Sequence, residues 1–208
     1  MGIPEPHHAL PGAVLPLPDA LLRFAPDFLA TAEADALLHE LHAAIPWEQH
    51  HVRLSGRTLP APRLSCWIGD RDAAYTYSRV RFAPRPWPAA LAALRARLET
   101  CCAARFNSVL ANLYRDGRDA MGWHSDDEPE LGAAPLIASL SLGAPRRFLL
   151  RARSGGATRS TVLTLSHGSL LLMGGACQRL YRHAVPRTRA AVAPRINLTF
   201  RWVQPRQR

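Results

Sequence analysis

The second half of the chain is a series of short segments of strand-forming residues separated by turn residues. The segments are Phe106–Tyr114, Leu136–Leu142, Arg147–Arg153, Thr161–Leu165, Ser169–Met173, Arg182–Val185 and Arg195–Val203. Glycines lie between or beside them, where they favour turns. Many short strands joined by turns are typical of antiparallel sandwiches, barrels and jelly rolls. The series therefore predicts a mainly antiparallel β-structure.

Two helical segments precede these strands. The segment Asp27–Ile45 has apolar residues at helical spacing, namely Leu37, Leu38, Leu41 and Ile45. The segment Pro88–Ala104 has a second apolar stripe, formed by Leu91, Leu94, Leu98 and Cys102. We expect both stripes to pack against the strands. The fold class is therefore α+β, mainly β: a jelly roll buttressed by N-terminal helices.

The length of 208 residues suits one domain with a real core. We expect a Pro-rich arm over residues 1–18 and a single domain over residues 19–208. The four cysteines (Cys66, Cys101, Cys102 and Cys177) have neither zinc-site nor disulfide-framework spacing, so we expect reduced packing residues. No stretch has the length and apolarity of a membrane span, and we expect no secretion signal, because the N-terminus lacks a basic segment followed by an apolar one. We expect a cytoplasmic monomer with no membrane partner.

The formal net charge of the chain is +10, and all of its basic residues except histidine are arginine. A basic surplus of this size favours a polyanionic partner such as nucleic acid. The abundance of alanine, arginine and proline would also follow from a GC-rich genome, so charge alone leaves the partner open.

His124 and Asp126 are the first candidate metal ligands. Residues two apart on an extended backbone point to the same face, so one imidazole and one carboxylate can share a metal there. His183 is the best candidate for a third ligand. Two histidines and one carboxylate are typical of non-haem Fe(II) oxygenases, and they also bind zinc. An isolated His-x-Asp match would indicate only a hydrogen-bonded histidine and a solvated aspartate.

The last predicted strand gives the metal interpretation its support. Arg195, Asn197, Thr199 and Arg201 alternate with Ile196, Leu198 and Phe200. One face of the strand is therefore polar and carries two guanidinium groups, which are costly to bury without anions. Arginine is suited to bidentate carboxylate recognition. A dicarboxylate co-substrate beside an iron would explain both features.

These motifs together resemble those of the AlkB-type nucleic-acid demethylases, which depend on Fe(II) and 2-oxoglutarate. The matching patterns are Asn112-x-Tyr114, His124-x-Asp126, His183 and Pro194-Arg-x-Asn-x-Thr-x-Arg201. Phe106-Asn-Ser, Trp123-His-Ser-Asp-Asp-Glu-Pro, Ile137-Ala-Ser-Leu-Ser and His167-Gly-Ser-Leu resemble the animal homologues that act on single-stranded methylated DNA and RNA. The resemblance covers about Pro62 to Val203, and it implies the double-stranded β-helix form of the jelly roll.

The resemblance also implies a chemistry. His124, Asp126 and His183 would hold Fe(II), while Arg195 and Arg201 would bind 2-oxoglutarate, with Arg195 on the distal carboxylate. Asn112 and Tyr114 would add hydrogen bonds, and Asn197 and Thr199 are secondary candidates. With O2, such a site would demethylate N-alkylated bases such as 1-methyladenine and 3-methylcytosine in DNA or RNA. Formaldehyde, succinate and CO2 would be released, and the partner would be methylated single-stranded DNA or RNA.

Substrate recognition would fall to a lid around residues 47–82. Tyr77, with Tyr75 beside it, would stack on the flipped base, and Arg63 belongs to the same region. Asp127 would lie beside the pocket, where a carboxylate favours a cationic methylated base. Phosphates would be held by arginines among Arg53, Arg57, Arg63, Arg79, Arg115 and Arg118. We expect Arg146, Arg147, Arg151, Arg153 and Arg159 to face solvent instead.

Three alternatives remain open. A zinc hydrolase would use the same two histidines and one carboxylate, but it gives the two arginines of the last strand no role. A non-catalytic basic β-sandwich would bind nucleic acid without needing the metal ligands. A 2-oxoglutarate oxygenase acting on protein or another non-nucleic-acid substrate would differ mainly in the lid.

Overall fold

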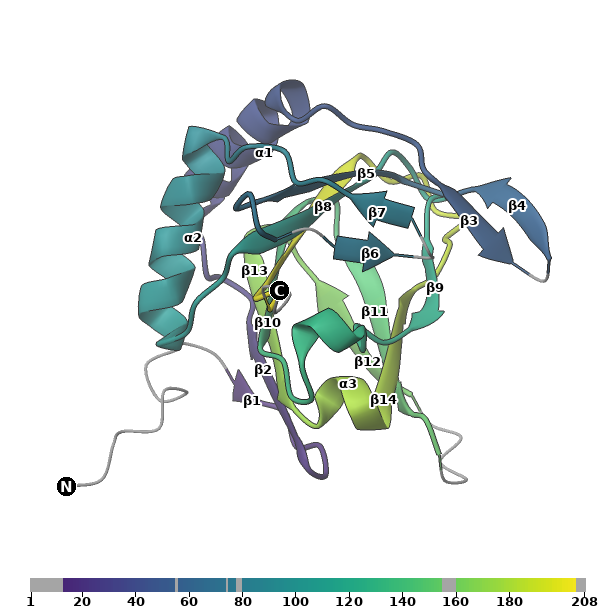
Figure 1. Cartoon of the computed structure of the whole chain (residues 1–208). Coiled ribbons are helices and arrows are strands. Elements are labelled where there is room, and N and C mark those ends of the chain that lie inside the picture. Colours follow the sequence, from purple (N-terminus) through teal and green to yellow (C-terminus); the bar gives the residue numbers. More distant parts are fainter. Residues whose placement is uncertain (1–12, 55, 74, 78–79, 155–159, 205–208) are drawn as a thin grey trace.

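The computed structural model describes residues 13–54, 56–73, 75–77, 80–154 and 160–204 (Figure 1). For residues 52–54, 75–77 and 80–82 it describes the backbone only. Two facing antiparallel sheets form the centre of the structure, and two long helices lie to one side of them. This arrangement confirms the predicted mainly β fold class.

The larger sheet has seven strands, and each adjacent pair is antiparallel. In spatial order they are β1 (Ala13–Val14), β2 (Ala20–Ala25), β13 (Ser169–Gly175), β10 (Ile137–Gly143), β15 (Arg195–Arg201), β8 (Ser108–Tyr114) and β5 (Leu64–Gly69). Strand β15 therefore lies near the middle of the sheet, between β10 and β8. The central position explains why both of its faces are buried.

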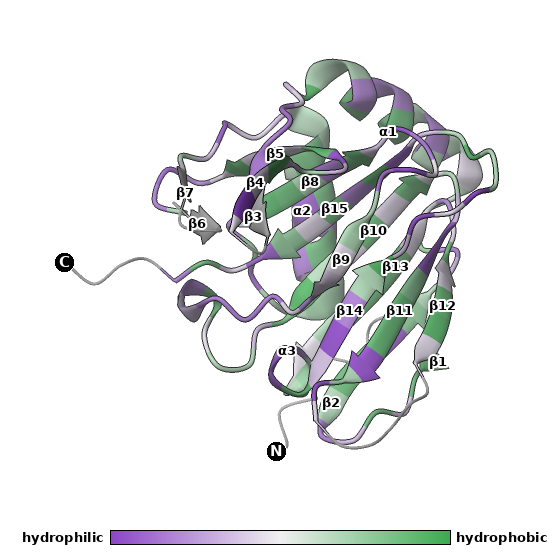
Figure 2. Cartoon of the chain, turned by 90° about the vertical axis from the view of Figure 1, so that its right-hand side faces the viewer, coloured by the Kyte–Doolittle hydropathy of each residue, from purple (hydrophilic) through white to green (hydrophobic). Residues whose placement is uncertain are grey.

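The smaller sheet has four strands and faces the larger one. Its order is β12 (Thr161–Leu165), β11 (Arg146–Ala152), β14 (Tyr181–Val185) and β9 (Met121–His124). Side chains from both sheets meet between them: Ile137, Leu171 and Met173 of the larger sheet pack with Phe148 and Leu150 of the smaller. In Figure 2 the strands β10 and β13 are largely hydrophobic, and β11 has a hydrophobic middle, in agreement with this shared core.

The helices α1 (Thr31–Ala44) and α2 (Ala89–Cys102) cover the outer face of the larger sheet (Figure 1). The predicted stripes supply the contact, because Leu41, Leu91, Leu94 and Leu98 are fully or almost fully buried against this sheet. Helix α1 begins four residues later than the predicted segment. Pro88 directly precedes α2, where its missing N–H group costs no hydrogen bond.

Shorter elements complete the described part of the chain. These are the hairpin of β3 (His51–Leu54) with β4 (Arg57–Pro60), the hairpin of β6 (Tyr75–Tyr77) with β7 (Val80–Phe82), the 3-10 turn η2 (Pro129–Leu131) and the short helix α3 (Cys177–Leu180). All four cysteines are free thiols. Among the described helices, none combines the length and apolarity needed to cross a membrane.

The predicted strands of the second half all occur, with ends displaced by at most two residues. Strands β2 and β5 were not predicted, and β5 extends the larger sheet beyond β8. One arginine expectation was wrong. Arg146 is only 3% exposed and donates hydrogen bonds to the carbonyls of Asp116, Asp119 and Pro186, because the loops around β11 close over it.

Candidate active site

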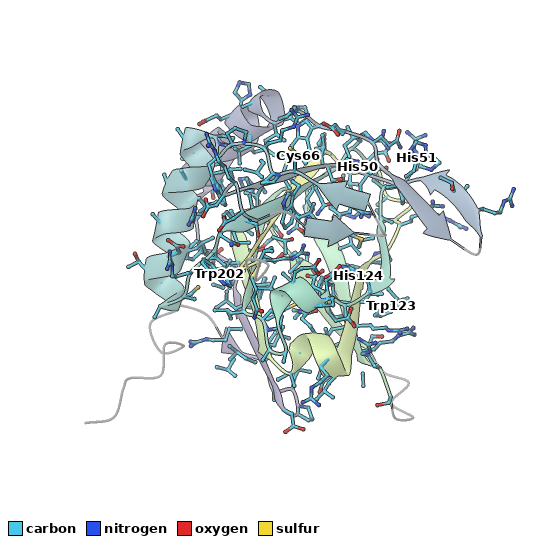
Figure 3. The ribbon with its side chains drawn as sticks, in the orientation of Figure 1. His50, His51, Cys66, Trp123, His124 and Trp202 are labelled. Carbon is cyan, nitrogen blue, oxygen red and sulfur yellow. The ribbon has the colours of Figure 1, made fainter. Side chains whose placement is uncertain are left out.

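His124, Asp126 and His183 come together at the edge of the smaller sheet. One ligand atom from each lies within 4.8 Å of the other two. The two histidines lie on adjacent strands, β9 and β14, and are partners in the strand register. Asp126 follows two residues after β9 ends, so a loop positions it rather than the sheet. Figure 3 shows His124 beside Trp123, with His124 nearer the centre of the molecule.

The surroundings of Asp126 and His183 keep both side chains in metal-binding forms. Burial by itself would raise the pKa of Asp126, but Arg201 and the two imidazoles outweigh it and lower that pKa to about 2. Nη2 of Arg201 lies 2.8 Å from Oδ1 of Asp126, and both side chains are buried. Burial also lowers the pKa of His183 to about 3. A carboxylate and neutral imidazoles are the protonation states that coordinate metals.

The orientation of His124 is fixed by its own strand. Its Nδ1 lies 2.8 Å from the carbonyl oxygen of Gly122, so Nδ1–H is the donor of this hydrogen bond. Nε2 is then the ring nitrogen that faces the metal site, 3.8 Å from Oδ1 of Asp126. Ligating histidines commonly use this arrangement, in which one ring nitrogen donates to a carbonyl and the other binds the metal.

The polar face of β15 points into the space between the sheets. Arg195, Asn197, Thr199 and Arg201 are all at most 8% exposed. Asn197 donates from Nδ2 to Oγ of Ser139 at 2.8 Å and accepts from the Thr199 hydroxyl at 3.0 Å. Asn197 and Thr199 thus satisfy each other and Ser139. This leaves the two guanidinium groups as the strongest binding groups on the face.

Arg195 has the most unusual environment of the four. Its side chain is 1% exposed, and its Nη2 donates to the Ser141 hydroxyl at 2.9 Å. Its Nε and Nη1 have no hydrogen-bond acceptor within the described residues. Burial lowers the pKa of Arg195, a shift that Tyr114 opposes and Arg146 reinforces. A buried guanidinium with two available nitrogens is suited to a carboxylate ligand.

Tyr114 and Asn112 border the same space from β8. The Tyr114 ring contacts two cations, with the guanidinium carbons of Arg195 and Arg146 at 5.1 Å and 5.6 Å from its centre. Oδ1 of Asn112 accepts a hydrogen bond from Nε of Arg63 at 2.9 Å. The Asn112 NH2 group is therefore the end of the amide left for a ligand.

One cavity contains every predicted metal and co-substrate residue. Its lining includes His124, Asp126, His183, Asn112, Tyr114, Arg195, Asn197, Thr199 and Arg201. Other lining residues were not predicted, including Ser139 and Phe148. Ser139 belongs to the run Ile137-Ala-Ser-Leu-Ser, where strand alternation could have placed it on the inner face. Phe148 stacks on His183 with ring centres 5.2 Å apart.

The predicted substrate residues are placed differently. Arg63 is 6% exposed and is held by Asn112 and the Ala120 carbonyl, so it supports the co-substrate residues rather than a surface. Asp127 is half exposed and forms an ion pair with Arg153, beside a second cavity. Tyr75 and Tyr77 lie on β6, and their side chains are outside the described part of the structure.

The predicted phosphate-binding arginines have different surroundings in the described residues. Arg115 is ion-paired with Asp119 and Arg118 with Asp116. Arg57 is exposed on β4. The side chains of Arg53 and Arg79 lie outside the described residues.

Comparison with known proteins decides the family. Residues 21–201 match the family model described as the 2OG-Fe(II) oxygenase superfamily. The chain belongs to this superfamily. Its name specifies Fe(II) and 2-oxoglutarate, and the cavity fits both. It holds three convergent metal ligands, and its buried Arg195 has nitrogens available for a carboxylate.

The relatives confirm the AlkB-type resemblance within this superfamily. The chain is 43% identical to the human alpha-ketoglutarate-dependent dioxygenase alkB homolog 3 over 86% of its own length and 65% of that protein. It is 38% identical to the mouse DNA oxidative demethylase ALKBH2 over 84% of its length and 77% of that protein. The structure of OsALKBH1 shares the fold, with a TM-score of 0.58 and 19% identity over 91% of this chain and 99% of the other.

Proposed function

We propose that this 2OG-Fe(II) oxygenase is a dioxygenase that removes methyl groups from N-alkylated bases in DNA or RNA. The observation that carries the proposal is the joint presence of three metal ligands and two buried guanidinium groups in one cavity. A zinc hydrolase would explain the metal ligands but not the arginines. The chain spans 65% of the length of alkB homolog 3. We therefore propose the activity from the residues of this chain rather than from that relative.

The two arginines would take different parts of 2-oxoglutarate. Arg201 lies against Asp126, so it would bind the carboxylate nearest the metal. Arg195 lies six residues away on the same strand face, beside Tyr114, and would bind the distal carboxylate. When bound, Fe(II) with 2-oxoglutarate and O2 supplies the oxidation of an N-methyl group. The oxidised group leaves as formaldehyde, and succinate and CO2 are the co-products.

The nucleic-acid substrate is supported by charge and by a named relative. The formal net charge is +10, and a relative at 38% identity is a DNA oxidative demethylase. A methyl group on a Watson–Crick edge is unreachable inside a duplex, so the base must be flipped out or unpaired. The hairpins β3–β4 and β6–β7 fall within the predicted lid at 47–82, and we propose that they hold a single strand, with Tyr77 stacking on the base.

Succinate and formaldehyde release from methylated oligonucleotides tests the proposal. Purified protein with Fe(II), 2-oxoglutarate and O2 should repair single strands carrying 1-methyladenine or 3-methylcytosine. His183→Ala should abolish both products, whereas His42→Ala, at an exposed position on α1, should leave them unchanged. Succinate without base repair would indicate another substrate. Activity with zinc in place of iron, independent of 2-oxoglutarate, would contradict the proposal.

A further inference from the structure

The loop that carries Asp126 has few backbone contacts to either sheet. Strand β9 ends at His124, and residues 125–128 have no regular secondary structure. The pairing of β9 with β14 is irregular, with a register shift between His183 and Val185. Asp126 is nevertheless 4% exposed. A buried backbone N–H requires an acceptor. Because strand pairing does not reach Asp126, another group must accept its N–H.

Gln178 supplies that acceptor. Its side chain is in the short helix α3, it is 2% exposed, and its Oε1 accepts the backbone N–H of Asp126 at 3.0 Å. At the other end of the same amide, Nε2 lies 3.7 Å from the sulfur of Met173. A thioether sulfur is a weak acceptor and not a donor, so this contact favours the orientation in which the oxygen faces Asp126.

The neighbours of Asp126 are tied to the same region. The Ser125 hydroxyl donates to the carbonyl of Tyr181, the residue that follows α3, at 2.8 Å. Nη1 of Arg153 contacts the Asp127 carboxylate and lies 3.5 Å from the Gln178 carbonyl. Each of the three consecutive residues 125–127 therefore has its own partner. Ser125 is held by Tyr181, Asp126 by Gln178 and Asp127 by Arg153. These side-chain and carbonyl contacts hold residues 125–127 in place, as strand pairing holds His124 and His183.

We infer that Gln178 is a positioning residue for the metal site, acting through the backbone of Asp126. The inference rests on the proposed function, in which Asp126 binds the metal. Gln178 itself lies outside the residues that line the metal cavity. It fixes where the Asp126 carboxylate is placed and leaves that carboxylate free for the metal and Arg201. Partners of this outer kind typically change metal affinity by roughly 10–100-fold when they are lost.

Cobalt(II) binding provides a readout that does not depend on turnover. Gln178→Met keeps the length of the side chain and removes the oxygen acceptor. We expect it to weaken Co(II) affinity by roughly 10–100-fold and to alter the visible ligand-field absorption of bound Co(II). Arg179→Met is the matched control, because Arg179 is the exposed neighbour on α3, and it should bind Co(II) like the wild type. Thermal melting of the metal-free variants separates a packing defect from a change in affinity.

Hydrogen exchange of the wild-type protein tests the contact without any substitution or metal. The amide of Asp126 should exchange much more slowly than that of the exposed Asp127, although both lie outside the strands. Equal exchange of the two amides would overturn the inference, as would normal Co(II) affinity and absorption in a folded Gln178→Met variant. Failure of the wild type to bind any metal would instead contradict the proposed function.

Discussion

Replacing Arg195 with methionine should separate co-substrate binding from stability. The guanidinium is 1% exposed and donates a hydrogen bond from Nη2 to Ser141, while its Nε and Nη1 have no acceptor within the described residues. In the proposed complex these nitrogens bind a carboxylate of 2-oxoglutarate. Truncating one partner of a buried charge pair costs about 2–5 kcal/mol. The dissociation constant for 2-oxoglutarate should therefore rise by roughly 30- to 5,000-fold.

The ligand-free protein should be affected far less. Replacing a buried ion pair by apolar side chains of similar volume is neutral or stabilising by about 1–4 kcal/mol, and we expect the same sign for a buried guanidinium. Loss of the hydrogen bond to Ser141 removes about 0.5–1.5 kcal/mol. The free energy of unfolding of metal-free Arg195→Met should therefore change by about −1.5 to +3.5 kcal/mol. At 2–4 °C per kcal/mol for a chain of this size, its melting temperature should lie between roughly 6 °C below and 14 °C above that of the wild type.

Arg146→Met is the matched control, because Arg146 lies over the same Tyr114 ring but donates to three backbone carbonyls. Its loss should lower stability by about 2–4 kcal/mol and leave 2-oxoglutarate affinity within a few-fold of wild type. Calorimetric titration with 2-oxoglutarate and thermal melting give both quantities. Normal 2-oxoglutarate affinity in a folded Arg195→Met protein would refute the assignment of Arg195.

Three further outcomes are expected. Affinity for oligonucleotides, measured by fluorescence anisotropy, should fall steeply with added salt because phosphate contacts release counterions; a flat response would make the arginine surplus compositional. Tyr77→Ala should weaken binding of all methylated bases by about 1–3 kcal/mol. Asp127→Ala should instead change the ratio of methylated-adenine repair to methylated-cytosine repair. If Asp127→Ala lowers both repair rates in proportion, Asp127 supports the metal site and does not contact the base. Burial by itself would raise the pKa of Asp119, but Arg115 outweighs it and lowers that pKa below 3.8. The Asp119–Arg115 ion pair should therefore stabilise the fold above about pH 4, and this stabilisation should be lost on further acidification. Urea unfolding of Asp119→Asn at several pH values should lack this pH dependence of stability.

Local patterns predicted the parts of this protein whose role follows from position along one strand. Alternation alone placed Arg195 and Arg201 on one face of β15, and the structure buries that face between the sheets. The two-residue spacing of His124 and Asp126 also brought them together, although Asp126 lies beyond the strand for which the argument was made.

Contacts between segments distant in sequence could not be predicted from those patterns. Arg63 resembled a surface arginine, but β5 pairs with β8 and brings it to Asn112. The burial of Arg146 likewise depends on loops 27 to 40 residues away in the sequence. Asp127 and Arg153 are separated by 26 residues, so their ion pair could not be inferred from either neighbourhood. Register and loop closure, rather than residue type, decide these partners.

The division of the site between two sheets has a consequence for folding. The histidines belong to the smaller sheet, the arginines belong to the larger one, and the Asp126–Arg201 ion pair joins them. A metal and a dicarboxylate bound together would therefore be a non-covalent cross-link between the two halves of the sandwich. Anything that binds only the folded form stabilises it by mass action. The cellular supply of iron and 2-oxoglutarate would then help determine how long the folded protein survives, as well as how fast it works.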